Sequence, residues 1–151
     1  CGIAYTFGDQ SSQWRGIVSA DYEYVDYAKM KMRNGSDGHD FFQENKDIAD
    51  YYRSVANLRF GGELSYDNVA VRAGFATYGN PYKSDVGKNG AGNFYSLGVG
   101  YRASIFFVDF AYSLFMQKDK SYLYKSLDVS SSEIAYDVRQ SNLMLTLGLR
   151  F

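Results

Sequence analysis

Apolar and polar residues alternate along most of this 151-residue chain, and this alternation limits its fold more than any other feature. The clearest case is the last segment, where leucines recur at every second position from 143 to 149. Successive side chains of a β-strand point to opposite faces, so this period predicts strands with one apolar and one polar face. The predicted strands are 1–7, 14–31, 56–66, 69–80, 93–103, 105–124 and 133–151.

The composition agrees with strands and tight turns, and it excludes several kinds of site. The chain has 15 Tyr, 11 Phe and 15 Gly, which are common in strands and turns, but a single Cys and a single His. One Cys excludes a disulfide within the chain, and one Cys with one His excludes a zinc site built from those ligands. With 16 basic and 17 acidic residues, the net charge of −1 argues against a nucleic-acid partner.

Catalytic motifs are absent from the sequence, which has no plausible Ser/His/Asp grouping, Cys/His pair or phosphate-binding loop. The chain is therefore predicted not to be an enzyme and to bind no cofactor. Acidic residues between 32 and 55 could ligate calcium, but their spacing does not match an EF-hand, and a solvated loop is the favoured interpretation. These residues are Asp37, Asp40, Glu44, Asp47 and Asp50.

Hydropathy alone does not decide whether the chain enters a membrane. No apolar run reaches the roughly 18–20 residues of a transmembrane helix, and the mean hydropathy is −0.35. A membrane barrel escapes both criteria, because its strands alternate between lipid-facing and water-facing residues. The connections also alternate in length, as the short periplasmic turns and long extracellular loops of outer-membrane barrels do. The short ones are 8–13, 67–68 and 103–104, and the long ones are 32–55, 81–92 and 125–132.

The first long connection is expected to carry a helix. Ile48, Tyr51, Tyr52 and Val55 recur at helical spacing, and Asn45 is a candidate N-cap. The strand before it is expected to cross the headgroup region, with basic residues near lipopolysaccharide phosphates. These basic residues are Lys29, Lys31 and Arg33.

The rival fold is a soluble antiparallel sandwich or small barrel with its apolar face inward. Three features favour the membrane: charges of both signs on the polar face, an apolar face free of charge for about 9–10 residues per strand, and tyrosines near strand ends. We expect the charged residues to face a barrel lumen, where they pair with one another or contact a ligand; pairing is the favoured interpretation. They are Asp21, Glu23, Arg59, Glu63, Arg72, Arg102, Asp109 and Arg150.

The C-terminal segment resembles the β-signal of outer-membrane proteins, which ends in an aromatic residue behind alternating apolar residues. The resemblance implies recognition by the barrel-assembly machinery. The residues that carry it are Leu143, Leu145, Leu147, Leu149 and Phe151.

Seven is an odd number of strands, whereas bacterial single-chain barrels have an even number. One explanation is an unrecognised eighth strand, which would complete a small barrel with a structural or adhesion role. The other is that residues 1–151 are the C-terminal part of a larger outer-membrane barrel. The absence of a signal peptide and the strand pattern at the first residues favour the second explanation.

Five stretches of sequence support a family resemblance. They are RGIVSADYEYVDY at 15–27, VRAGF followed by YGNPY at 71–82, YSLGVGYR at 95–102, FFVDFAY at 106–112 and LTLGLRF at 145–151. In order and spacing they resemble the C-terminal half of the FadL/OMPP1/TodX family of outer-membrane hydrophobic-compound transporters, in its Bacteroidetes-type form. The resemblance implies a fourteen-stranded barrel with an N-terminal hatch, of which the hatch and early strands are not in this sequence. It also implies passive uptake of long-chain fatty acids or other hydrophobic small molecules.

Overall fold

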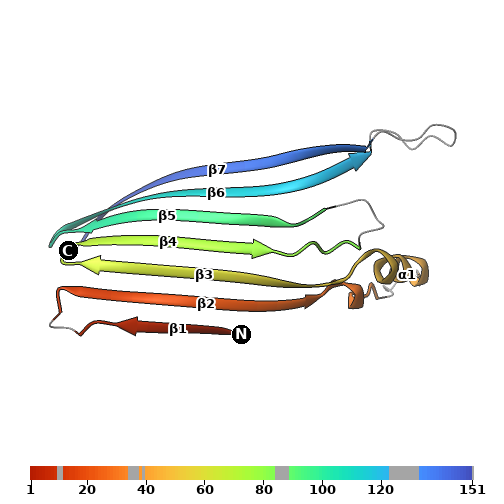
Figure 1. The fold of residues 1–151 in the computed structure, drawn as a ribbon, viewed down its shortest axis with the longest axis horizontal. Helices are drawn as coiled ribbons and strands as arrows, with labels where there is room; N and C mark the ends of the chain where they lie inside the picture. Colours follow the sequence, from red (N-terminus) through yellow and green to blue (C-terminus); the bar gives the residue numbers. More distant parts are fainter. Residues whose placement is uncertain (10–11, 34–37, 39, 84–88, 123–132, 151) are drawn as a thin grey trace.

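The computed structural model describes residues 1–150 apart from 10–11, 34–37, 39, 84–88 and 123–132. Within these residues, seven strands form one antiparallel sheet in which each strand pairs with its neighbours in the chain (Figure 1). The strands are β1 (Gly2–Phe7), β2 (Trp14–Asp26), β3 (Ser54–Tyr66), β4 (Val69–Tyr78), β5 (Gly92–Arg102), β6 (Phe106–Tyr122) and β7 (Glu133–Leu149). The predicted antiparallel all-β fold is confirmed.

The two ends of the sheet differ in their connections. At the end that we call the turn end, the strands are joined by 8–13, 67–68 and 103–105. At the opposite loop end lie the connections 27–53, 79–91 and 123–132. The hairpin at 67–68 is tight because Asp67 has a φ of 50°, a left-handed conformation that Asp adopts more readily than most residues.

The sheet is a single layer without a hydrophobic core. Among the described residues, the buried hydrophobic side chains are only Val55, Ala70 and Ala76. The accessible surface is 11569 Å², against about 7,700 Å² for a compact monomer of this mass. β1 and β7 lie at opposite edges (Figure 1), so these seven strands do not close into a ring.

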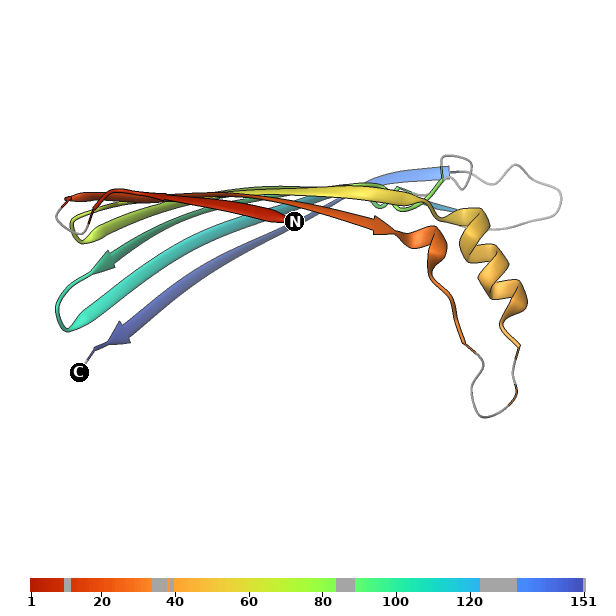
Figure 2. The same ribbon diagram turned by 90° about the horizontal axis from the view of Figure 1, so that it is seen from below.

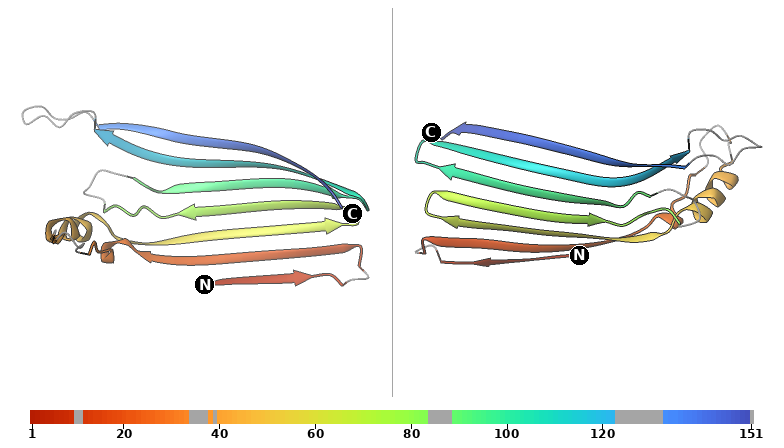
Figure 3. Two further views of the ribbon diagram at one scale, coloured as in Figure 1. Left: turned by 180° about the vertical axis from the view of Figure 1, so that it is seen from behind. Right: turned by 45° about the horizontal axis from the view of Figure 1, so that its top comes forward.

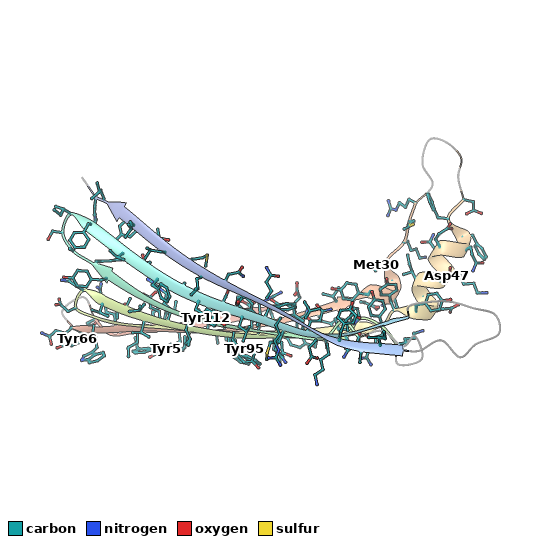
Figure 4. All side chains as sticks on the ribbon, turned by 90° about the horizontal axis from the view of Figure 1, so that it is seen from above. Tyr5, Met30, Asp47, Tyr66, Tyr95 and Tyr112 are labelled. Atoms are coloured by element: carbon teal, nitrogen blue, oxygen red, sulfur yellow. The ribbon has the colours of Figure 1, made fainter. Side chains whose placement is uncertain are left out.

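The sheet is also curved, which distinguishes its two faces. At the turn end, β5, β6 and β7 bend progressively away from the plane of β1 and β2, toward the side on which the helix α1 (Phe42–Tyr51) lies (Figure 2). In both views of Figure 3, α1 stands at the loop end beside the ends of β2 and β3. Tyr5, Tyr66 and Tyr95 lie on the side away from α1 (Figure 4). We call that side the convex face and the α1 side the concave face.

The register extends these two faces across all strands, because directly paired residues point to the same side. One row on the convex face contains Tyr5, Val18, Gly62, Ala73, Leu97, Tyr112 and Leu143. The neighbouring row on the concave face contains Ser19, Gly61, Gly74, Ser96, Ser113 and Asn142. The alternation in the sequence therefore becomes one apolar and one polar surface.

The second predicted strand, 14–31, is too long by five residues. β2 ends at Asp26, and Tyr27–Lys29 forms a single 3₁₀ turn closed by the bond from the Met30 amide to the Tyr27 carbonyl. Lys29 Nζ lies 3.0 Å from the Asp26 carboxylate, and this hydrogen bond raises the pKa of the Lys29 ammonium group. The basic residues at 29–33 therefore follow the strand and do not continue its alternation.

The predicted helix exists but begins earlier than expected. α1 starts at Phe42, so Asn45 is inside its first turn and is not its N-cap, while Val55 belongs to β3. A hydrogen bond of 2.9 Å between Gln43 and Asp47 supports the helix surface. At the C-terminal end, Lys83 Nζ donates to the Ala49 carbonyl over 2.8 Å, where a cation is favoured by the helix dipole. No helix among the described residues is long and apolar enough to span a membrane.

The Asn45 side chain instead holds α1 to the segment after β2. Its Oδ1 accepts from the Met32 amide at 2.7 Å, and its Nδ2 donates to the Met32 carbonyl at 3.0 Å. At the other end, Arg53 donates through its amide to the Pro81 carbonyl, and the rings of Tyr52 and Tyr82 lie 5.1 Å apart. α1 is therefore fixed at both ends to neighbouring chain segments.

Replacing Asn45 by alanine is expected to free the Met32 backbone. Each lost hydrogen bond contributes about 1 kcal/mol, so the Met32 amide should exchange its hydrogen at least about tenfold faster. Hydrogen exchange read by mass spectrometry on peptides spanning Met32 would measure this. The control is Gln43→Ala, which removes a bond made within α1, and an unchanged exchange at Met32 in Asn45→Ala would contradict the assignment.

Candidate functional site

The register gathers the predicted charged residues on the concave face. Asp21 and Glu23 come from β2, Arg59 and Glu63 from β3, Arg72 from β4, Arg102 from β5 and Asp109 from β6. Arg150 follows β7 and lines a hollow together with Arg102 and Phe107. The structure thus brings into one surface residues that are up to 129 positions apart in the chain.

The first charged cluster lies toward the loop end, on β2 and β3. Arg59 donates to the Glu23 carboxylate at 2.6 Å, and Asn57 Nδ2 donates to the same carboxylate oxygen at 3.1 Å. Asn57 is buried, and its Oδ1 accepts from the Gly79 amide at 3.1 Å. The Arg59 guanidinium also lies 5.7 Å from the centre of the Tyr78 ring, within cation–π range. The cluster links β2 and β3 to the connection after β4.

The second cluster joins three strands through one arginine. Arg72 Nε donates to Glu63 at 2.5 Å, and its Nη1 donates to Asp109 at 2.7 Å. Ser65 Oγ adds a second bond to the Glu63 carboxylate at 3.1 Å. Because Asp109 is on β6, the Arg72 side chain must pass over β5 to reach it.

Gly100 provides the room for this crossing. It is paired with Asp109, and a Cβ atom at this position would overlap the Asp109 carboxylate and lie 3.2 Å from Arg72 Nη1. The alternation of residues along the chain does not by itself predict this role for Gly100 or the hydrogen bonds of Asn57. The glycines at 98 and 100, on the polar face of one predicted strand, indicate the role of Gly100. A strand without side chains on that face lets long side chains of its two neighbours meet above it.

The predicted mutual pairing is therefore found for five of the eight charged residues. Three others, Asp21, Arg102 and Arg150, make no ion pair among the described residues. Asp21 stands directly opposite Arg59 in the register, yet Arg59 bonds the diagonal residue Glu23. Arg102 lines a hollow with Arg15 and Glu63 near the turn end, but Glu63 is already bonded to Arg72.

From β4 to β7 the concave face becomes apolar at the loop end. Phe94 pairs with Phe115, and Tyr78 shares the next row with Val138. The Tyr78 and Phe115 rings meet edge to face at 6.4 Å. The result is an aromatic patch on the concave face, bordered on the β3 side by the Arg59–Glu23 pair.

The convex face changes in the opposite sense. Toward the turn end it is apolar on every strand, and the leucines of the C-terminal segment are 66–70% exposed there. These leucines are Leu143, Leu145, Leu147 and Leu149, and Phe151 lies outside the described residues. At the loop end the convex face carries Thr77, Asn93, Lys118, Asp137 and Arg139. From β4 to β7 the two faces therefore exchange polarity within the same sheet.

Candidate metal ligands do not cluster in the described part of the chain, where no group of three His, Cys, Asp or Glu residues could hold an ion. The acidic residues of α1 and its approach belong to this part, but Asp37 and His39 lie outside it. Searches of family models, curated proteins and solved structures find no match to this chain. The function is therefore inferred from the two faces of the sheet and the residues on them.

Proposed function

We propose that this chain forms part of the wall of an outer-membrane β-barrel that passively admits hydrophobic small molecules, such as long-chain fatty acids. The observation that carries the proposal is the apolar convex face. On β6 its convex residues are apolar from Phe106 to Met116. Ten steps at about 3.4 Å span about 34 Å along the strand. At the ~40° tilt of barrel strands this gives about 26 Å, close to the ~25 Å apolar band of outer-membrane barrels.

The concave face supports the lumen side of the proposal. The ion pairs of Arg72 lie at mid-sheet, as suits a hydrated interior, while an aromatic patch and the Arg59–Glu23 pair stand side by side at its loop end. A hydrophobic molecule approaching from the loop end would meet this patch before it reached the ion pairs of Arg72. α1, fixed at both of its ends, stands at the same end of the sheet (Figure 2). Passive movement requires no catalytic group, so the proposed protein is not an enzyme.

The shallow curvature favours a large barrel over the complete eight-stranded barrel with a structural or adhesion role. In an eight-stranded barrel, seven consecutive strands would bring β1 and β7 close together, whereas here they stand at opposite edges (Figure 1). β1 and β7 also run in the same direction, so one strand or another odd number of strands must stand between them in an antiparallel ring. The resemblance to the fourteen-stranded transporters agrees with the larger ring.

Uptake by intact cells tests the proposed function. Deleting the full-length gene is expected to lower the uptake of labelled long-chain fatty acid, and a plasmid copy should restore it. A copy carrying Phe115→Asp should restore less, because a carboxylate would interrupt the aromatic patch. The control is Phe110→Tyr on the convex face of the same strand, which should restore uptake fully. Equal uptake with and without the gene would favour the structural or adhesion role.

A further inference from the structure

Two hollows lie next to each other on the convex face, and they differ in chemistry. One is a hollow of about 320 Å³ at the loop end, where the polar side chains of Lys118, Arg139 and Asn93 stand among apolar lining groups such as those of Met116 and Ala91. The other is an open apolar groove of about 400 Å³ over Ala73, beside the row of rings formed by Phe60, Phe75 and Tyr95. We name them the polar hollow and the apolar groove.

The register shows that the two adjoin along the strands. On β4, Phe75 lines the apolar groove and Thr77, the next convex residue, lines the polar hollow. On β5, Tyr95 and Asn93 repeat this arrangement. The boundary between them is also where the apolar band of the convex face ends. A molecule that fills both would have a polar head and an apolar tail directed toward the turn end.

Small side chains create the apolar groove. Ala73 lies in it between the bulky residues of neighbouring rows, and it pairs with Leu97 on one side and Gly62 on the other. The Phe75 and Tyr95 rings, 5.3 Å apart, wall its loop end. An acyl chain can lie along such an open groove, because its methylene groups gain contact with the aromatic and aliphatic side chains that line it.

The charge of the polar hollow identifies the head group. Lys118 and Arg139 are exposed and make no ion pair among the described residues, although Asp137 stands opposite Lys118 in the register. Two cations against one carboxylate leave a net positive site. Asn89, Asn93 and Thr77 add uncharged polar groups around it. Arginine and lysine in this setting favour a phosphate group.

We infer that the convex face binds one phosphate-bearing membrane lipid, with its head group in the polar hollow and an acyl chain in the apolar groove. This inference rests on the proposed membrane-spanning role of the sheet. It goes beyond that role by naming a lipid site on the outer wall, separate from the concave face. The occupant is a lipid and not free phosphate, because the groove beside the cations is apolar.

Native mass spectrometry of the full-length protein, folded into vesicles and then released into detergent, tests the inference. Protease protection in the vesicles first establishes insertion. From phosphatidylglycerol vesicles the protein is expected to retain one lipid, at least about tenfold more than from phosphatidylcholine vesicles. Millimolar inorganic phosphate should not displace it.

Two variants separate the contribution of the head group to lipid retention from that of the acyl chain. Lys118→Gln with Arg139→Gln should reduce retention of phosphatidylglycerol about tenfold and remove the preference over phosphatidylcholine. Ala73→Phe should reduce retention of both lipids by filling the groove. The matched controls are Val71→Phe, which places the same ring on the same face of β4 outside the groove, and Lys46→Gln on α1.

Each outcome decides for or against the site. An inserted protein that retains no lipid, or whose two site variants behave like wild type, overturns the lipid site and leaves the proposed function standing. Displacement by inorganic phosphate alone would show an anion site without a lipid, and it also overturns the inference. A chain that does not insert overturns both proposals.

Discussion

Replacing Leu97 by arginine is expected to impair the folding of the full-length protein into bilayers and to destabilise what inserts. Leu97 is at the middle of the apolar part of β5, is 62% exposed on the convex face, and is flanked on that face by Tyr95 and Val99. If this surface meets lipid, an arginine near the bilayer midplane costs about 2–4 kcal/mol. Folding into phospholipid vesicles, followed by the heat-dependent shift in gel mobility and by urea titration, would measure the loss.

Two adjacent residues on β7 provide the matched control. Leu145 is 66% exposed on the convex face, and Met144 is 57% exposed on the concave face. Leu145→Arg should therefore destabilise the inserted protein, whereas Met144→Arg should cost less than about 1 kcal/mol, because it faces the hydrated side. A soluble sheet protein predicts that Leu97→Arg leaves an unfolded protein in solution with no effect specific to the bilayer. Equal losses for Leu145→Arg and Met144→Arg would contradict the assignment of the two faces.

The seven strands were predictable because the alternation of apolar and polar residues is a local property of the sequence. Hydrogen bonding between the strands then aligns segments that already have this pattern. Their limits were harder to predict where alternation continues without a strand. Met30 and Met32 alternate with basic residues, yet the chain turns at Asp26, where Lys29 reaches back to its carboxylate. The helix start was missed for a similar reason: Asn45 has the residue type of an N-cap but bonds to Met32, thirteen residues away.

The ion pairs were predictable only as a set. Sequence places charges of both signs on one face, but the choice of partner depends on register and on side-chain reach. Arg59 bonds Glu23 and not Asp21, the residue opposite, because a long side chain reaches a diagonal neighbour across antiparallel strands. Arg72 reaches Asp109 only because Gly100 leaves space over β5. The alternation within one strand does not show how that strand is aligned with a strand two positions away in the sheet.

The exchange of polarity at the loop end did leave a signal in the sequence. In β7 the apolar residues stand at odd positions from 143 to 149 but at even positions 134, 136 and 138. A shift of parity inside one uninterrupted strand moves the apolar side chains to the opposite face. The band of apolar convex residues therefore ends before the strand does. Beyond this end, the aromatic patch lies on the concave face and the polar hollow on the convex face.

Replacing Arg72 by glutamine is expected to lower the stability of the protein by a large amount for a substitution on the concave face. It would leave Glu63 and Asp109 without their shared cation. Breaking a fully buried pair costs about 3–5 kcal/mol and breaking an exposed one about 0–1. The Arg72 side chain is 33% exposed, so we expect about 1–3 kcal/mol, measured as a lower urea midpoint of the protein folded in vesicles.

Two comparisons separate the lost ion pairs from a loss of packing. Arg102→Gln changes the same residue type on the same face where no ion pair exists among the described residues, so it should cost little. Adding Glu63→Gln and Asp109→Asn to Arg72→Gln should recover part of the stability, because neutral side chains at these two positions no longer require the cation. A penalty that is unchanged in this triple variant, or equally large for Arg102→Gln, would mean that Arg72 acts by filling space and not by joining the carboxylates of β3 and β6.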